Sequence, residues 1–289
     1  MKIAIINTKG GVGKSTFAMQ LIAPYYLSRF GQASLYEIDD YNFDASDYKK
    51  TLVECESIFV GREPDRALEK LRMAMAGKNS VVDVGGNETA GRFLAAGGQN
   101  HLGRRLDAII VPVSQTGKDV ENAEKTIRLV KEELTSFEGK FILGVTRIPG
   151  EYSYEDLQYR FPDLMELAEN TGASIITLPN DSSIPMSRMM GSTAWELATF
   201  SNDHIDSIQD AMIEEEEKGD EANIATLRRL NRYTVTIESA IRLKPYLEER
   251  FDLLDELLGV TPEMTTEGLS THSKGVEVTP EDDLAAQGD

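Results

Sequence analysis

Cysteine and histidine are nearly absent from this sequence. Cys55 is the single cysteine among 289 residues, and His101, His204 and His272 are the only histidines. One thiol excludes an internal disulfide, and this set of side chains is too small for a zinc cluster. The fold therefore has to be stable without cross-links or structural zinc.

Long apolar runs are also missing. No stretch approaches the roughly 20 apolar residues of a membrane-spanning helix. A strand-like run begins at Met1, which leaves no room for a signal peptide before it. We therefore expect a cytoplasmic protein without a membrane partner.

Basic residues are outnumbered, with 30 lysines and arginines against 49 acidic residues and a net charge of −19. Such a charge opposes contact with nucleic acid or anionic lipid. Most of it lies late in the chain, with −7 on residues 204–259 and −6 on residues 260–289. The remaining −6 is spread over residues 1–203, which leaves room for a local basic face there.

The sequence does contain a series of short, β-branched apolar runs separated by amphipathic segments. These runs are Lys2–Asn7, Ser34–Ile38, Ser80–Asp83, Asp107–Val113, Lys140–Thr146 and Ser174–Leu178. Strands of a parallel sheet that is covered on both faces have no solvent side, and they show this pattern. We therefore predict an α/β domain at residues 1–201, with a mostly parallel sheet and helices on both faces.

A helical extension is predicted for residues 202–259. A charged break at residues 214–220 interrupts it, and Pro245 is expected to start a second helix. Its stripe of large aliphatic side chains either packs on the α/β domain or binds a partner, and both interpretations stay open. Residues 260–289 are acidic and poor in large apolar groups, so we expect a disordered tail there.

The most specific motif directly follows the first strand-like run and precedes a helical run. It consists of Lys9, Gly10, Gly11, Val12, Gly13, Lys14, Ser15 and Thr16. A glycine-rich turn between strand and helix presents several backbone N–H groups to one point, and the helix dipole adds positive charge. Glycines let this backbone approach phosphate oxygens without a Cβ in the way. The motif therefore predicts a P-loop for a nucleoside triphosphate.

Three side chains of the motif are expected to complete the site. Lys14 should reach the β- and γ-phosphates, the Ser15 hydroxyl should ligate Mg²⁺, and Thr16 should lie on the α-phosphate side. The expected cofactors are therefore ATP and Mg²⁺. The alternative interpretation, a glycine-rich turn with two surface lysines, is disfavoured by the flanking strand and helix.

The motif is similar to the deviant Walker A motif of the ParA/MinD family of P-loop ATPases, KGGxGK[ST], and matches it in full. Thr8 stands where the ordinary P-loop has its first glycine. The resemblance implies a homodimer that forms on ATP. It also implies that Lys9 reaches across the dimer interface to the partner's ATP and neutralises charge on the transferred phosphate.

The run from Glu37 to Asn42 resembles the family's second-strand segment, D-x-D-P-Q. Asp39 matches the second aspartate, which in the family orients the attacking water and contacts the Mg²⁺ shell. Asp40 and Tyr41 replace the proline and glutamine, which leaves open whether Asp39 or Asp40 faces the phosphate. A solvated acidic turn is the alternative interpretation.

The run SVVDVGG resembles Walker B, an apolar strand that ends in Asp83. This residue would hold Mg²⁺ through water, and it completes a predicted metal-binding set with Ser15 and Asp39. Gly85 and Gly86 replace the family's prolines, so we expect a more flexible loop after the strand.

Later matches concern the nucleotide base. Thr146 ends an apolar run where the family often has an asparagine for adenine. Pro179 belongs to a segment similar to the family's loop beside the base. The resemblance implies that both residues bind near the base.

Segregation of plasmid or chromosomal DNA is the commonest role in this family. The resemblance therefore implies an ATPase that dimerises on ATP and segregates or positions DNA or another cargo. The implied partners are nonspecific DNA and a ParB-like or other activating protein. Arg228, Arg229 and Arg232, at helical spacing, are candidate DNA contacts, with a solvated helix face as the alternative.

An ATP-switched scaffold or assembly protein without DNA binding is the main alternative function. A membrane-cycling protein of the MinD type would need a basic amphipathic C-terminal helix, whereas this tail is acidic. Cys55 alone cannot supply the ligands of the nitrogenase reductase and arsenical-pump branches. A tyrosine kinase would need a tyrosine cluster in the tail, but no tyrosine follows Tyr246. A small-molecule ligase or kinase is disfavoured because Lys9 has no role in most of them.

Overall fold

The structure is a computed structural model that describes residues 1–40, 44–61, 63–114, 117–148, 152–199, 202–219 and 223–265. Its centre is a seven-stranded sheet in the order β3-β2-β4-β1-β5-β6-β7, and every neighbouring pair is parallel. The strands are β1 Lys2–Ile5, β2 Ser34–Ile38, β3 Glu54–Ile58, β4 Ser80–Val84, β5 Ala108–Val113, β6 Lys140–Ile148 and β7 Ser174–Pro179. The predicted α/β class with a parallel sheet is confirmed.

One strand, β3, is absent from the sequence prediction. It lies at an edge of the sheet and reads ECESI, with only its last residue buried. An edge strand has one neighbour and a solvent-facing side, so it does not need the continuous apolar run by which the other strands were found.

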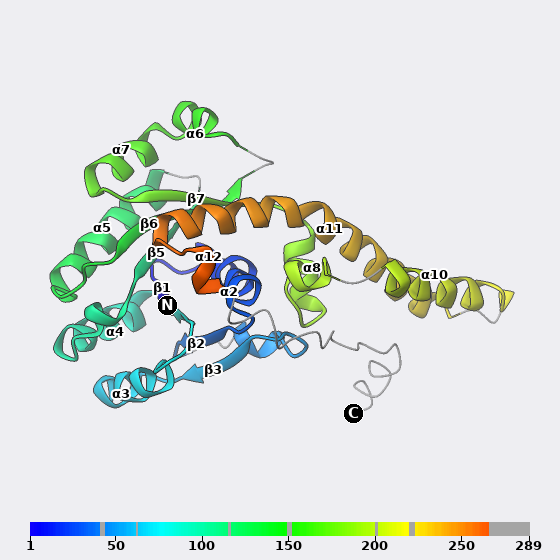
Figure 1. The fold of residues 1–289 in the computed structure, drawn as a ribbon, viewed down its shortest axis with the longest axis horizontal. Coiled ribbons are helices and arrows are strands. Elements are labelled where there is room, and N and C mark those ends of the chain that lie inside the picture. Colours follow the sequence, from blue (N-terminus) through cyan, green and yellow to red (C-terminus); the bar gives the residue numbers. More distant parts are fainter. Residues whose placement is uncertain are drawn as a thin grey trace.

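Helices cover both faces of the sheet and create two cores (Figure 1). The first core is built by α3 Pro64–Ala74, α4 Asn87–Gln99, α5 Gly117–Glu133, α6 Tyr154–Arg160 and α7 Pro162–Thr171. The second is built by α1 Lys14–Phe17, η1 Ala18–Ile22, α2 Ala23–Phe30, α8 Ser183–Met189, α9 Ala194–Leu197 and α11 Ile224–Leu258. Short 3₁₀ turns form at η2 Asp44–Asp47 and η3 Leu102–Arg105. The six strands other than β3 are therefore covered from both sides, as predicted.

The helix after the P-loop changes its winding. Its first turn, α1, is α-helical, whereas η1 is π-helical and α2 is α-helical again. Pro24 stands at the start of α2, where its ring would clash with a carbonyl four residues earlier in a regular α-helix. The wider π turn lets one helix continue from the P-loop to Gly31 despite this proline.

The helix α11 is continuous over 35 residues, with Pro245 inside it. The prediction that Pro245 starts a second helix is therefore wrong. A proline inside a helix costs about 3 kcal/mol, but buried contacts on both sides of it hold this helix together. The buried side chains are Ile237, Ala240, Leu243, Tyr246, Leu247, Phe251 and Leu254.

The first half of α11 pairs with α10 Asn202–Glu216 in a hairpin that projects from the body (Figure 1). The second half belongs to the second core, so the aliphatic stripe there packs on the sheet domain. The predicted tail begins with a short helix, α12 Pro262–Thr265, which contacts α2. Residues 266–289 lie outside the described residues. Among the described helices, none is long and apolar enough to cross a membrane.

Candidate nucleotide site at the carboxyl ends of the strands

The P-loop motif folds into a turn between β1 and α1, at the carboxyl end of the sheet. Gly11 and Gly13 have left-handed backbone conformations, with φ of 72° and 92°. A Cβ on Gly13 would also lie 2.8 Å from Cγ2 of Thr146. Both positions therefore require glycine, Gly13 for backbone and packing reasons together.

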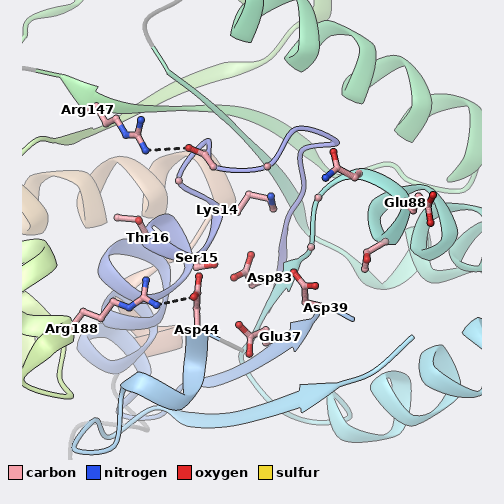
Figure 2. A pocket seen from close by; sticks show the side chains of 17 residues that line it. Lys14, Ser15, Thr16, Glu37, Asp39, Asp44, Asp83, Glu88, Arg147 and Arg188 are labelled. Atoms are coloured by element: carbon pink, nitrogen blue, oxygen red, sulfur yellow. Dashed lines mark hydrogen bonds and ion pairs between the residues drawn. The ribbon is translucent and has the colours of Figure 1, made fainter. Parts of the chain in front are cut away.

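This turn borders a cavity of about 600 Å³ (Figure 2). Its charged and hydroxyl lining residues are Lys14, Ser15, Thr16, Glu37, Asp39, Asp44, Asp83, Glu88, Thr89, Arg147 and Arg188. The P-loop contributes the glycines of the wall, and the acids come from the ends of β2 and β4 and from the segments that follow them. Ligands of open parallel sheets bind at this edge.

Lys14 is the cation at the centre of the cavity. It is 8% exposed, and its Nζ donates a hydrogen bond to the carbonyl oxygen of Lys9 at 3.2 Å. Burial lowers the pKa of the Lys14 ammonium, while the charges of Asp83, Asp39 and Asp44 oppose this effect. Among the described residues, the Lys9 carbonyl is the hydrogen-bond partner of this buried ammonium, and such an ammonium suits a phosphate oxygen.

Asp83 lies beside Ser15 at the end of β4. Burial raises the pKa of the Asp83 carboxyl to about 6, against the opposing effects of a hydrogen bond from Ser15 and the charge of Lys14. Among the described residues, no group donates a hydrogen bond to Oδ1 of Asp83. Such an unsatisfied buried carboxylate oxygen next to a hydroxyl fits a hydrated magnesium ion.

The part of the chain that the structure describes contains no cluster of three or more carboxylate, histidine or cysteine ligands able to hold a metal. Mg²⁺ is usually bound through one or two carboxylates together with waters and phosphate oxygens. The set of Ser15, Asp39 and Asp83 fits that kind of site, in which the nucleotide supplies the remaining ligands.

Asp39 and Asp40 point in different directions. Asp39 lines the cavity near Asp83 (Figure 2). Asp40 instead accepts hydrogen bonds from the backbone N–H groups of Val60 at 2.9 Å and Gly61 at 2.8 Å, and it pairs with Arg92 at 3.0 Å. Asp40 therefore holds the segment after β3, and Asp39 is the carboxylate that faces the cavity.

Glu37 is a buried acid of the cavity to which the sequence assigned no role. It pairs in register with Asp83 on the neighbouring strand, and it accepts hydrogen bonds from the Ser57 hydroxyl at 3.0 Å and the Ala45 N–H at 3.3 Å. Burial is the main cause that raises the pKa of Glu37 to about 7. At neutral pH this side chain is therefore partly protonated.

Because of this raised pKa, the stability of the protein without nucleotide and metal should depend on pH. Because the pKa of Glu37 rises from 4.5 to about 7 on folding, the folded state binds the proton more tightly, and stability falls as pH rises through this window. Glu37→Gln removes the ionisation, so it should stabilise the protein at pH 8 by up to about 3 kcal/mol and change little at pH 4.5. Urea unfolding at both pH values in EDTA tests this expectation, and equal effects at the two pH values would contradict it.

Gly85 and Gly86 let the loop after β4 pack closely against the rest of the site. A Cβ on Gly85 would lie 2.6 Å from Oδ2 of Asp39, and one on Gly86 would lie 3.1 Å from the backbone N of Gly10. The next residue, Asn87, donates its N–H to the Thr8 carbonyl oxygen at 2.6 Å. The two glycines thus have a packing role, which the sequence did not indicate.

Lys9 lies beside the P-loop and forms an ion pair with Asp119 of α5. The Asp119 side chain is 4% exposed and also accepts a hydrogen bond from the Ser114 hydroxyl, whereas the Lys9 side chain is 41% exposed. The structure contains one chain, so the role of Lys9 at a partner's nucleotide stays a prediction. Within the chain, Asp119 is the residue that holds this lysine.

A second cavity of about 240 Å³ adjoins the P-loop and contains both residues predicted near the base. Thr146 is 3% exposed, and its hydroxyl lies 3.4 Å from the Val12 carbonyl oxygen. Pro179 ends β7 and lines the same cavity as Thr16. The structure therefore brings the predicted base residues next to the predicted phosphate residues.

Arg147 borders both cavities and was not predicted. Its φ is 60°, a left-handed conformation that is rare outside glycine, and it sits where the pairing of β6 with β7 is irregular. Its guanidinium donates to the Gly11 carbonyl oxygen at 3.2 Å (Figure 2). Strained backbone of this kind is concentrated at functional sites.

The fold and site define a parallel α/β protein with a glycine-rich turn and a cavity lined by a lysine and several acids at the carboxyl end of its sheet. Among solved structures, McdA from Cyanothece, an ATP complex of a variant, matches with a TM-score of 0.51 and 13% identity over 90% of this chain and 96% of the other. MinD from Aquifex aeolicus has a TM-score of 0.47 and 14% identity, with 84% and 95% covered. A plasmid partition protein from Borrelia burgdorferi has a TM-score of 0.40 and 16% identity, with 59% and 98% covered.

The McdA match shows that this chain shares the fold of that protein. No protein-family model matches the sequence, and neither does any curated protein.

Proposed function

We propose that this chain is an ATPase of the ParA/MinD type, which binds ATP with Mg²⁺ in the pocket of Figure 2 and forms a homodimer when ATP is bound. The observation that carries the proposal is the buried Lys14 inside a glycine turn, next to the unsatisfied carboxylate oxygen of Asp83. A surface turn with solvated lysines has neither feature. The shared fold with McdA, solved with ATP, supports the same assignment.

Each residue then has a defined role. The amides of residues 10–16 and the Lys14 ammonium bind the β- and γ-phosphates, and Thr16 lies on the α-phosphate side. Ser15, Asp39 and Asp83 hold Mg²⁺, which neutralises charge on the phosphate oxygens when it is bound. Asp39 also orients the attacking water, since phosphoryl transfer depends mainly on position and electrostatic stabilisation.

Lys9 supplies the step that links hydrolysis to dimer formation. It leaves Asp119 and contacts the nucleotide of the partner protomer, where an ammonium stabilises the charge that develops on the transferred phosphate. An isolated chain then lacks one cation of the complete site. This arrangement makes slow hydrolysis in the monomer and faster hydrolysis in the dimer the expected behaviour.

Lys9→Ala tests this link. Because the Lys9 side chain is partly exposed and is paired with Asp119, the variant should bind Mg-ATP within about threefold of the unaltered chain, but its hydrolysis and ATP-dependent dimerisation should fall about tenfold or more. Calorimetry, phosphate release and light scattering measure the three quantities. Asp119→Asn is the matched variant, because it frees Lys9 without removing it and should not reduce dimerisation. Unaltered hydrolysis and dimerisation in Lys9→Ala would contradict the role across the interface.

The biological action that we propose is segregation or positioning of DNA or another cargo, with a ParB-like or other protein that stimulates hydrolysis. The test is sedimentation with nonspecific duplex DNA in the presence of ATP, ADP or no nucleotide, at two salt concentrations. We expect binding that requires ATP and weakens steeply with salt, because phosphate contacts release counterions. No binding at low salt would favour the second candidate, an ATP-switched scaffold, which the net charge of −19 also favours.

A further inference from the structure

A groove of about 740 Å³ lies outside the nucleotide pocket, between α8, the segment after η2 and the first half of α11. We call it the methionine groove and define it by Lys49, Met186, Met189, Met190, Arg229 and Arg232. The three elements are far apart in sequence, and the packing of α8 against α11 brings them together. The proposed ATPase cycle uses none of these six residues.

The apolar part of the groove consists of methionines. Met189 is 70% exposed, Met186 is half-buried, and Met190 packs partly on the second core. Methionine is unbranched and polarisable, so it adapts to apolar partners of different shapes and is common at binding surfaces. One exposed and two partly buried methionines that are bordered by polar residues form a small apolar patch, a feature of interaction sites.

The border of the groove is basic. Lys49, Arg229 and Arg232 line it, and so do Lys50 and Arg188. Asp47 is the one acid that lines it among the described residues, and Arg188 already binds this carboxylate at 2.7 Å. In a chain with a net charge of −19, this local excess of positive charge is unusual and selects an anionic partner.

We propose that the methionine groove docks an acidic amphipathic segment of a partner protein. An apolar side chain of that segment covers the methionines, and flanking carboxylates pair with Lys49, Arg229 and Arg232. A DNA backbone would supply the negative charge but no apolar group, so it would leave Met189 uncovered. The proposal does not depend on ATP hydrolysis by this chain.

The methionine groove and the nucleotide pocket have a lining residue in common, Arg188. Arg188 binds Asp47, which lines the groove, and also Asp44 at 2.7 Å, which lines the nucleotide pocket (Figure 2). The same guanidinium therefore borders both sites.

The test uses the full chain and a fluorescein-labelled helical peptide that carries leucines at i and i+4 on one face and glutamates around them. Three further probes separate the contributions: the same peptide with serine for leucine, the same peptide with lysine for glutamate, and a labelled duplex DNA. Fluorescence anisotropy gives the affinity of each. We expect the acidic leucine peptide to bind at least about tenfold more tightly than each of the others, a difference of about 1.4 kcal/mol.

Two matched double variants show where on the chain the peptide binds. Arg229→Glu with Arg232→Glu should weaken the acidic peptide at least about tenfold, whereas Arg104→Glu with Arg105→Glu makes the same charge change on exposed residues of η3 and should leave the affinity unaltered. Met189→Ser should weaken the binding of the acidic leucine peptide about threefold, and the dependence of that binding on salt should stay the same. Circular dichroism and ATP binding confirm that each variant is folded.

Several results would overturn the proposal. If both double variants weakened the peptide equally, the groove would not be its site. If the serine peptide bound as tightly as the leucine peptide, the methionines would have no role. If duplex DNA bound more tightly, with the same dependence on Arg229 and Arg232, the groove would bind nucleic acid instead. None of these results alters the test of ATP hydrolysis, so the two proposals can fail separately.

Discussion

Lys14→Ala should weaken the binding of Mg-ATP by at least about 100-fold. Lys14 is 8% exposed and stands among acids, and removal of one partner from a buried charge pair costs about 3–5 kcal/mol. Each tenfold change in affinity corresponds to about 1.4 kcal/mol, so this cost eliminates tight binding. Titration calorimetry with Mg-ATP measures the loss directly.

Lys9→Ala is the control for this experiment, because it removes a lysine of the same motif whose side chain is 41% exposed and bound to Asp119. If the Lys9 variant lost more than about tenfold in affinity for Mg-ATP, any positive charge near the loop would contribute to binding, and the position of Lys14 would not be special. An affinity of Lys14→Ala within about fivefold of the unaltered chain would contradict the assignment of the pocket to a triphosphate.

Asp39→Asn should lower the turnover number by about 100-fold and leave the affinity for Mg-ATP within a few-fold. The amide keeps the size of the side chain but orients a water less well and ligates Mg²⁺ less strongly. Because the Asp39 side chain borders the cavity and the amide keeps its size, the loss of unfolding free energy should be smaller than in a variant of a fully buried acid. Phosphate release under single-turnover conditions and urea unfolding measure the two effects.

Asp40→Asn should give the opposite result. Asp40 accepts two backbone N–H bonds and pairs with Arg92, and its side chain is 4% exposed. Its neutralisation removes the charge that faces Arg92 and weakens the hydrogen bonds from the two backbone N–H groups, at a cost of about 1–3 kcal/mol of unfolding free energy. The Asp40→Asn molecules that are folded should have nearly the same turnover number as the unaltered chain. If Asp40→Asn lost turnover and Asp39→Asn did not, the assignment of the two acids would have to be exchanged.

The parts of the site that could be predicted are those in which local sequence determines local geometry. A strand, a glycine turn and a helix start are contiguous at residues 2–17, so Lys14 and Ser15 follow from the motif alone. Asp83 follows from an apolar run that ends in an acid. The sheet could be predicted for the same reason, because strands buried on both faces are apolar throughout.

The parts that could not be predicted depend on contacts between distant segments. Asp40 turns away from the cavity because residues 60 and 61 offer it two N–H groups. Arg188 reaches the pocket from α8, and the left-handed conformation of Arg147 arises at an irregular strand pair. Pro245 stays inside a helix because the core packs on both sides of it. No short pattern in the sequence records these contacts.

The two halves of helix α11 differ in what they pack against. Its second half is fixed in the core, and Arg29 of α2 holds it through ion pairs with Asp252 and Asp255. Its first half extends outward with α10 as an arm (Figure 1). A helix rises about 1.5 Å per residue, so a tilt of about 5° at the root displaces an arm of about 20 residues by about 3 Å at its tip. Because α2 continues the helix that starts at Lys14, the half of α11 from which the arm extends is bound to the same helix that begins at the P-loop.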